Sequence, residues 1–145
     1  MRVDFYQLSR GPVESELPPL ARKVLETGQR LLVVSDDAPQ LGRIDEGLWA
    51  GRDSFLAHGR AGEAHQERQP ILLTDRLDPA NGAKFAALAD GRWRDEALGF
   101  ERVFLFFDGS TIEDARGTWR SLKDREGLER HYWEQGSAGG WKQIA

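Results

Sequence analysis

The sequence has no cysteine, and this absence removes several kinds of chemistry at once. Without a thiol the chain can form no disulfide framework, thiolate zinc site, iron–sulfur cluster or cysteine nucleophile. Long apolar runs are also missing. None approaches the roughly 18 residues that a membrane-spanning helix needs, and no charged-then-apolar leader opens the chain. We therefore expect a cytoplasmic protein with no membrane contact.

A basic excess is missing as well. The formal net charge is −4 and the isoelectric point is about 5.4. A protein that holds DNA by its phosphates usually carries an excess of lysine and arginine. We therefore expect no direct nucleic-acid contact, or one confined to a small basic patch. The five tryptophans are large aromatic side chains of the kind that anchor protein partners.

Phosphate-binding glycine motifs are not present either. A dinucleotide site needs G-x-G-x-x-G after the first strand, where this chain has Ser9-Arg10-Gly11-Pro12. No G-x-x-x-x-G-K-[ST] loop occurs. Asp36 and Asp37 follow a predicted strand, where a carboxylate could meet a ribose. Without the glycines, helix capping is the better interpretation of these two residues.

Catalytic motifs are equally scarce. The segment from His65 to Glu67 has the H-x-E pattern of zinc deaminases, but that chemistry also needs two cysteines on the metal. The other histidines, His58 and His131, lie too far away to give metal-ligand spacing. Asp108-Gly109-Ser110 is typical of a strand end, a turn and a helix cap rather than a nucleophile elbow. We expect no catalytic residue, metal or cofactor, and hence no enzyme.

The order of apolar segments predicts an α/β fold with a mixed, mostly parallel sheet flanked by helices. We expect one domain over residues 1–145, with residues 136–145 as a C-terminal extension. Strands are expected at Val3–Leu8, Leu31–Val34, Ile71–Thr74, Phe85–Ala89, Arg102–Phe107 and Leu128–Trp133. Helices are expected from Leu20 to a cap at Gly28, from Asp37 to Trp49, and from Ser110 or Thr111 to Glu126, and a loop over Gly51–Gln69. The segment Phe85–Ala89 also suits a helix, but the preceding Asn81-Gly82 turn favours a strand.

The last predicted helix carries two stripes. At about 100° per residue, one face is apolar. Its members are Ile112, Ala115, Trp119 and Leu122, and the stripe along the edge consists of Arg116, Arg120 and Lys123. A ligand with an acidic stretch, an aromatic end and a free carboxylate would suit such a shelf. Two alternatives stay open: an ordinary solvated face with Trp119 in the core, or phosphate binding.

A second candidate surface is formed by Trp49 and Phe55. Trp49 ends a predicted helix and Phe55 lies in the following glycine-bearing loop. Two large aromatics in such places can anchor a partner, or they can simply cover the core.

Segments in one consistent order along nearly the whole chain carry a family resemblance. They are Val3–Leu8, Asp45–Trp49, Ser54–Gly59, Pro70–Thr74, Ala115–Arg120, Tyr132–Gln135 and Gly140–Trp141. The block Asp-Glu-x-Leu-Trp followed by Ser-Phe-x-x-His is the most specific of them. In these segments the chain resembles the chi subunit of bacterial DNA polymerase III holoenzyme, an accessory subunit associated with the clamp loader.

The resemblance implies a single Rossmann-like domain without a functional nucleotide site, and two protein partners. One is the acidic, phenylalanine-ended C-terminal tail of single-stranded-DNA-binding protein, for which the family site carries over to Arg116, Trp119 and Arg120. Lys123 is added from helical geometry. The other is the psi subunit of the clamp loader, at Trp49 and Phe55. Family members often have tyrosine where this chain has Trp119.

The resemblance therefore implies a non-catalytic replication subunit that links the clamp loader to single-stranded-DNA-binding protein. The alternative is an adaptor that recruits a repair helicase or another partner through the same surface. A third hypothesis, a small enzyme of nucleotide metabolism, predicts that a nucleotide raises the melting temperature.

Overall fold

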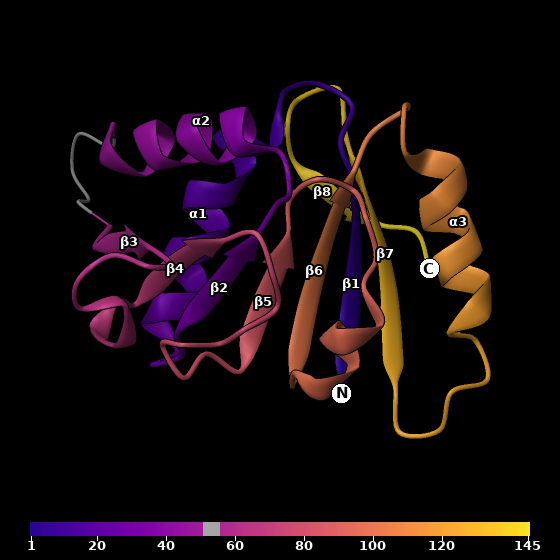
Figure 1. The fold of residues 1–145 in the computed structure, drawn as a ribbon. Helices are drawn as coiled ribbons and strands as arrows, with labels where there is room; N and C mark the ends of the chain where they lie inside the picture. Colours follow the sequence, from indigo (N-terminus) through magenta and orange to yellow (C-terminus); the bar gives the residue numbers. More distant parts are fainter. Residues whose placement is uncertain (51–55) are drawn as a thin grey trace.

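The structure is a computed structural model that describes residues 1–50 and 56–145. Its strands are β1 (Arg2–Gln7), β2 (Leu31–Val34), β3 (His58–Arg60), β4 (Ile71–Thr74), β5 (Phe85–Leu88), β6 (Arg102–Phe107), β7 (Glu129–Gln135) and β8 (Trp141–Gln143). Its α-helices are α1 (Val13–Glu26), α2 (Ala38–Trp49) and α3 (Ile112–Ser121), with short 3-10 helices η1 (Gln66–Arg68) and η2 (Asp95–Gly99). Figure 1 shows their arrangement.

Within the described residues the strands form one eight-stranded sheet in the order β3-β4-β2-β5-β6-β1-β7-β8. Every neighbouring pair is parallel except β7 and β8, which are antiparallel. The predicted mixed, mostly parallel α/β fold is confirmed. The later strands stay parallel although few α-helices separate them, because the chain returns through loops and the short helix η2.

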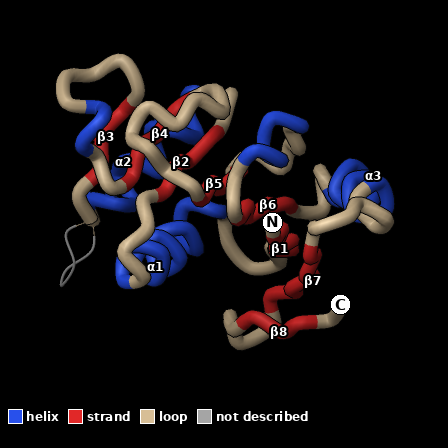
Figure 2. The backbone as a smooth tube through the Cα atoms, turned by 90° about the horizontal axis from the view of Figure 1, so that it is seen from below, coloured by secondary structure: helices blue, strands red, loops and turns tan. Residues whose placement is uncertain are grey.

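The two faces of the sheet have separate cores. Helices α1 and α2 cover one face through Val13, Leu17, Ile44 and Leu48. Helix α3 and η2 cover the other through Ala115 and Ala97, together with Leu122, which follows α3. In Figure 2 α1 lies on one side of the strands, while α3 lies on the opposite side, beside β1 and β7. Strands β2 and β4 are buried at every position because both of their faces are covered.

The Asn81-Gly82 turn joins β4 to β5, but these strands do not form a hairpin, since β2 lies between them. Asn81 is buried instead. Its side-chain amide donates to the carbonyl oxygens of Leu31 and Gln69, at 3.4 and 3.0 Å, and its side-chain oxygen accepts from the Ala83 amide. The turn residue therefore ties the beginnings of three strands together.

Several predicted boundaries were wrong. Helix α1 begins at Val13, seven residues before the expected start at Leu20, and accommodates Pro18 and Pro19 in its interior. The expected loop Gly51–Gln69 contains β3 and η1. Helix α3 ends at Ser121 rather than Glu126, and Thr111 precedes it without a side-chain cap. Phe85–Leu88 is a strand, as favoured, and Gly28 adopts the left-handed conformation expected of a helix stop.

The predicted C-terminal extension joins the sheet. Strand β8 pairs with the end of β7, and the pattern continues past it: the Ile144 amide donates to the Tyr132 carbonyl at 2.9 Å, and the Tyr132 amide donates to Ala145 at 3.1 Å. The hairpin turn between β7 and β8 uses Gly139 at a φ of 89°. Residues 141–145 are thereby placed beside β7.

Candidate functional site

The turn before α3 sets the start of that helix. The carboxylate of Asp108 accepts from the Ser110 amide at 2.9 Å and from its hydroxyl at 2.6 Å. These hydrogen bonds, with the Ser110 hydroxyl bond foremost, lower the pKa of Asp108. Glu113 and Asp114 in the first turn favour the helix N-terminus electrostatically, which compensates for the missing cap.

Trp119 is shared between the core and the surface. Its ring meets Phe5 edge to face at 5.1 Å and Tyr132 at 5.6 Å between centroids. On its outer side the guanidinium of Arg130 lies 3.9 Å from the ring centroid and donates to the Trp119 carbonyl at 2.5 Å. The ring is only partly buried, so it fills the core at one edge and leaves another edge available.

A cavity of about 320 Å³ lies where α3 faces β7. It is lined by Gln7, Arg116, Trp119, Tyr132, Glu134, Ile144 and Ala145. Two of the residues predicted from the sequence, Arg116 and Trp119, therefore meet in one cavity, which we call the α3 cleft. The Arg116 side chain is 52% exposed and pairs with Glu113 at 3.2 Å. Such an exposed pair is weak and can exchange partners.

The other two predicted residues do not line the α3 cleft. Arg120 is exposed on α3 outside the cavity lining, and Lys123 lies in the turn after the helix. The expected continuous stripe of three cations is broken because α3 ends at Ser121, so the helical spacing no longer holds at Lys123.

Five residues that line the α3 cleft were not predicted as site residues: Gln7, Tyr132, Glu134, Ile144 and Ala145. Tyr132 donates its hydroxyl hydrogen to the side-chain oxygen of Gln7 at 2.5 Å. Burial raises the pKa of Tyr132, while the charge of Arg116 acts in the opposite direction. The period-two alternation of β7 was the signal available in the sequence, because it places residues 130, 132 and 134 on one side of the strand.

The second predicted surface is only partly described. Trp49 ends α2 and is 58% exposed, and its ring meets His58 edge to face at 5.2 Å. His58 is held by the Asp45 carboxylate at 2.5 Å and the Leu56 carbonyl at 2.7 Å. Phe55, the other residue predicted for this surface, lies outside the described residues.

The carboxyl ends of the strands, where α/β proteins often bind nucleotides, form a smaller cavity of about 260 Å³. Three carboxylates line it, those of Glu14, Asp90 and Asp108. Arg43 lies against Glu14 at 3.1 Å, so its charge is already engaged. This acidic lining disfavours a pyrophosphate. Asp37 caps α2 by accepting from the Gln40 amide at 3.2 Å, which confirms the capping interpretation for that residue.

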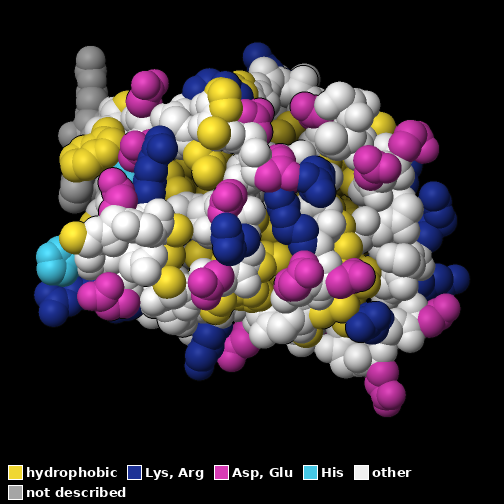
Figure 3. Space-filling model, in the orientation of Figure 1, with side chains coloured by type: hydrophobic (Ala, Val, Ile, Leu, Met, Phe, Trp, Pro, Cys, Tyr) yellow, Lys and Arg dark blue, Asp and Glu magenta, His cyan; other side chains and the backbone are white. Residues whose placement is uncertain are grey.

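Within residues 1–50 and 56–145, no three His, Asp or Glu side chains come together as a metal-binding group. In the same part of the chain no helix combines the length and apolar character needed to cross a bilayer. On the face shown in Figure 3, basic and acidic side chains are intermixed rather than gathered into one basic patch. That face therefore lacks the extended positive surface typical of nucleic-acid binding.

The fold and cavities define an α/β domain with a hollow on each face of a mostly parallel sheet. The model of the family "DNA polymerase III chi subunit, HolC" matches residues 1–129, so the chain belongs to this family of replication accessory subunits. One curated relative, the DNA polymerase III subunit chi of Escherichia coli (strain K12), is 34% identical over 62 residues. That stretch covers 42% of each of the two chains, less than half of the relative's length.

Proposed function

We propose that this chain is a non-catalytic replication subunit that binds the acidic C-terminal tail of single-stranded-DNA-binding protein at the α3 cleft. The observation that carries the proposal is the meeting of Arg116 and Trp119 in one cavity beside Tyr132. A peptide that ends in an aromatic residue needs an apolar wall for its ring and a cation for its terminal carboxylate. The α3 cleft offers both within one surface.

In the proposed complex the terminal phenylalanine ring packs against Trp119 and Ile144, which is 50% exposed. The tail carboxylate takes the place of Glu113 on Arg116. Aspartates farther from the tail end meet Arg120 and Lys123, which lie outside the cleft and act by attraction through solvent. Glu134 also lines the cleft and repels the tail, so the net attraction depends on Arg116.

The test is a calorimetric titration with a peptide ending in Asp-Ile-Pro-Phe, at low and moderate salt. Salt should weaken binding because exposed charges are screened. Arg116→Glu should lower the affinity at least about tenfold without changing the fold. Arg68→Glu is the matched control, since Arg68 is exposed on η1, away from the cleft. Equal affinities of the wild type and R116E would contradict the proposal.

The exposed ring of Trp49 favours a second contact, which we assign to the psi subunit of the clamp loader. Together the two contacts would tie the clamp loader to protein-coated single strands. Affinity purification of wild type and Trp49→Ala separates this function from the recruitment of a helicase. A clamp-loader component that co-purifies with the wild type but not with W49A supports the psi contact. A helicase that is lost from W49A instead supports the alternative adaptor.

A further inference from the structure

A second cavity, of about 450 Å³, lies on the opposite face of the sheet from the α3 cleft. We call it the α1 groove. Figure 2 shows α1 on one side of the sheet and the end of the sheet, at β8, curling toward that same side. Strand β7 separates the two cavities, because its alternation directs Tyr132 to the α3 cleft and Trp133 to the α1 groove. The volume is in the range of pockets that bind ligands.

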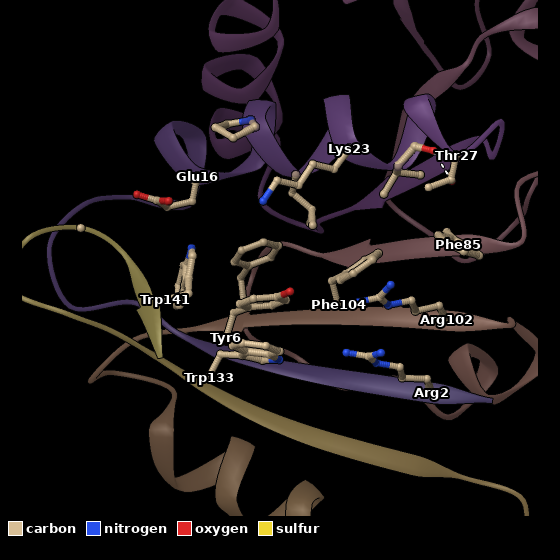
Figure 4. A pocket seen from close by; sticks show the side chains of 15 residues that line it. Arg2, Tyr6, Glu16, Lys23, Thr27, Phe85, Arg102, Phe104, Trp133 and Trp141 are labelled. Atoms are coloured by element: carbon tan, nitrogen blue, oxygen red, sulfur yellow. Dashed lines mark hydrogen bonds between the residues drawn. The ribbon is translucent and has the colours of Figure 1, made fainter. Parts of the chain in front are cut away.

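One end of the α1 groove is aromatic. The ring of Tyr6 is stacked beside Phe106 at 5.2 Å and beside Trp133 at 6.1 Å. Trp141, from β8, meets Tyr6 edge to face at 4.9 Å and stands across this end of the groove in Figure 4. Leu20 of α1 forms part of the opposite apolar wall. Tyr6, Trp133 and Trp141 all remain partly exposed, so their rings are accessible from the groove.

The other end is cationic. Arg2 and Arg102 both hold the fully buried Asp4, at 2.9 Å each, so two positive charges face one carboxylate. Lys23 points from α1 toward the strands in Figure 4. It is exposed, and it has no ion pair within residues 1–50 and 56–145. The groove thus carries an excess of positive charge beside its aromatic end.

The buried polar groups of the groove already have partners. The Trp133 indole donates to Asp4 at 3.0 Å, and Glu16 accepts from Gln135 at 2.7 Å. Among the described residues no buried side-chain nitrogen or oxygen lacks a hydrogen-bond partner. A small polar ligand would therefore find few groups that need it. The groove instead offers apolar surface for a bulky side chain and cations at the rim for a carboxylate.

A single strand of nucleic acid suits the groove less well. Base stacking on Tyr6 and Trp141 is physically reasonable, but a nucleic acid also needs a cationic track along its phosphates. Here Glu16 lies on the rim at the aromatic end, and Asp4 offsets one of the two guanidinium charges. The chain as a whole carries a net charge of −4. These charges favour a peptide with one or two carboxylates over a polyanion.

We propose that the α1 groove binds an acidic segment of a partner protein, with a bulky apolar side chain between Trp141, Tyr6 and Leu20. A carboxylate of the segment lies against Lys23 and Arg102. This site is independent of the α3 cleft, since its lining lies on the other face of the sheet.

The experiment uses the full chain and fluorescently labelled, blocked peptides that carry Phe, Trp or Leu as the central residue between Glu and Asp. Anisotropy at low salt should show binding of at least one of them, with no competition from the Asp-Ile-Pro-Phe peptide. Lys23→Glu should weaken it roughly 3- to 10-fold by reversing an exposed charge. Trp141→Ala should weaken it at least about tenfold by removing an aromatic wall.

Lys142→Glu is the matched control, because Lys142 is exposed on the same hairpin but does not line the groove. It should leave peptide binding unchanged. R116E should also leave it unchanged while abolishing tail binding, so failure of this proposal is distinguishable from failure of the proposed function. Absence of binding by all three peptides would overturn the proposal. Equal peptide binding by K23E and wild type would also overturn it. Binding of oligothymidylate that is abolished by both K23E and W141A would do the same.

Discussion

The two sides of β7 use the same kinds of residue in different ways. On the α3 side, Trp119 packs edge to face on Phe5 and is covered by Arg130, so the aromatic wall of the cleft is also a piece of the core. On the α1 side, Tyr6, Trp133 and Trp141 form a row that no helix covers fully. Because Trp119 also packs in the core, the aromatic wall of the α3 cleft is rigid and small. The uncovered rings on the other side leave the larger α1 groove.

The ion pairs on the two sides of β7 also differ in their burial. Arg116 in the α3 cleft is held by one exposed carboxylate, that of Glu113. Arg2 and Arg102 in the α1 groove are held by Asp4, which is fully buried. An exposed pair contributes little to stability, while a buried carboxylate between two cations is costly to remove. We therefore expect loss of the Asp4 carboxylate to lower stability strongly, and loss of the exposed Arg116–Glu113 pair to change stability little.

The largest expected effect is that of Asp4→Ala. It leaves Arg2 and Arg102 close together without their carboxylate and removes the acceptor of the Trp133 indole. We expect the free energy of unfolding to fall by about 3 kcal/mol, measured by urea denaturation. The matched change on the other side, Glu113→Ala, should cost less than about 0.5 kcal/mol. Similar losses in the two variants would contradict the expected difference between the buried and the exposed ion pairs.

The next largest effect is a difference in stability between substitutions of two tryptophans, Trp119 and Trp141. Trp119→Ala should destabilise the protein by about 3 kcal/mol because it opens a cavity against Phe5 and Tyr132. Trp141→Ala, on a short edge strand, should cost about 1 kcal/mol. The same denaturation experiment checks both. If W141A were the more destabilised variant, Trp141 would belong to the core and the α1 groove would not be an open surface.

The smallest effect is a pH dependence. Burial, aided by the charge of Asp4, raises the pKa of Tyr6 from 10.0 to about 12. Below pH 10 the folded and unfolded chains both keep this proton, so the contribution of Tyr6 to stability is fully present. Between about 10 and 12 only the folded chain keeps it, and stability falls as the pH rises.

Tyr6→Phe should remove that part of the alkaline loss. The chain has two tyrosines, so Tyr132→Phe leaves Tyr6 as the only source of tyrosinate absorbance in a spectroscopic titration. A Tyr6 titration near pH 10 in that variant would show that the α1 groove is more solvated than the structure indicates.

Much of the fold could be predicted from local patterns. The buried strands β4 and β6 have the predicted bounds because each is a continuous apolar run between turn residues. Strand β3 could not be predicted, since its three residues have no apolar pattern and are defined by pairing with β4. The end of α3 was missed because residues 122–126 continue the helical spacing while the backbone turns away.

The candidate sites were predictable in part. Arg116 and Trp119 lie one turn apart on a single helix, so their meeting follows from helical geometry. Tyr132 and Ile144 reach the α3 cleft from β7 and from the segment after β8, which only tertiary structure brings there. The α1 groove was not predicted at all. Its lining comes from α1 and several strands distant in sequence, and no single segment carries its pattern.

The most direct test of the tail-binding proposal is nuclear magnetic resonance of nitrogen-15-labelled protein, titrated with the Asp-Ile-Pro-Phe peptide. Each of the five tryptophans gives an indole signal. Binding of the tail in the α3 cleft should shift the Trp119 signal, while those of Trp133 and Trp141 stay in place. Shifts of Trp133 and Trp141 with Trp119 unchanged would contradict it, because they would place the tail in the α1 groove rather than in the α3 cleft.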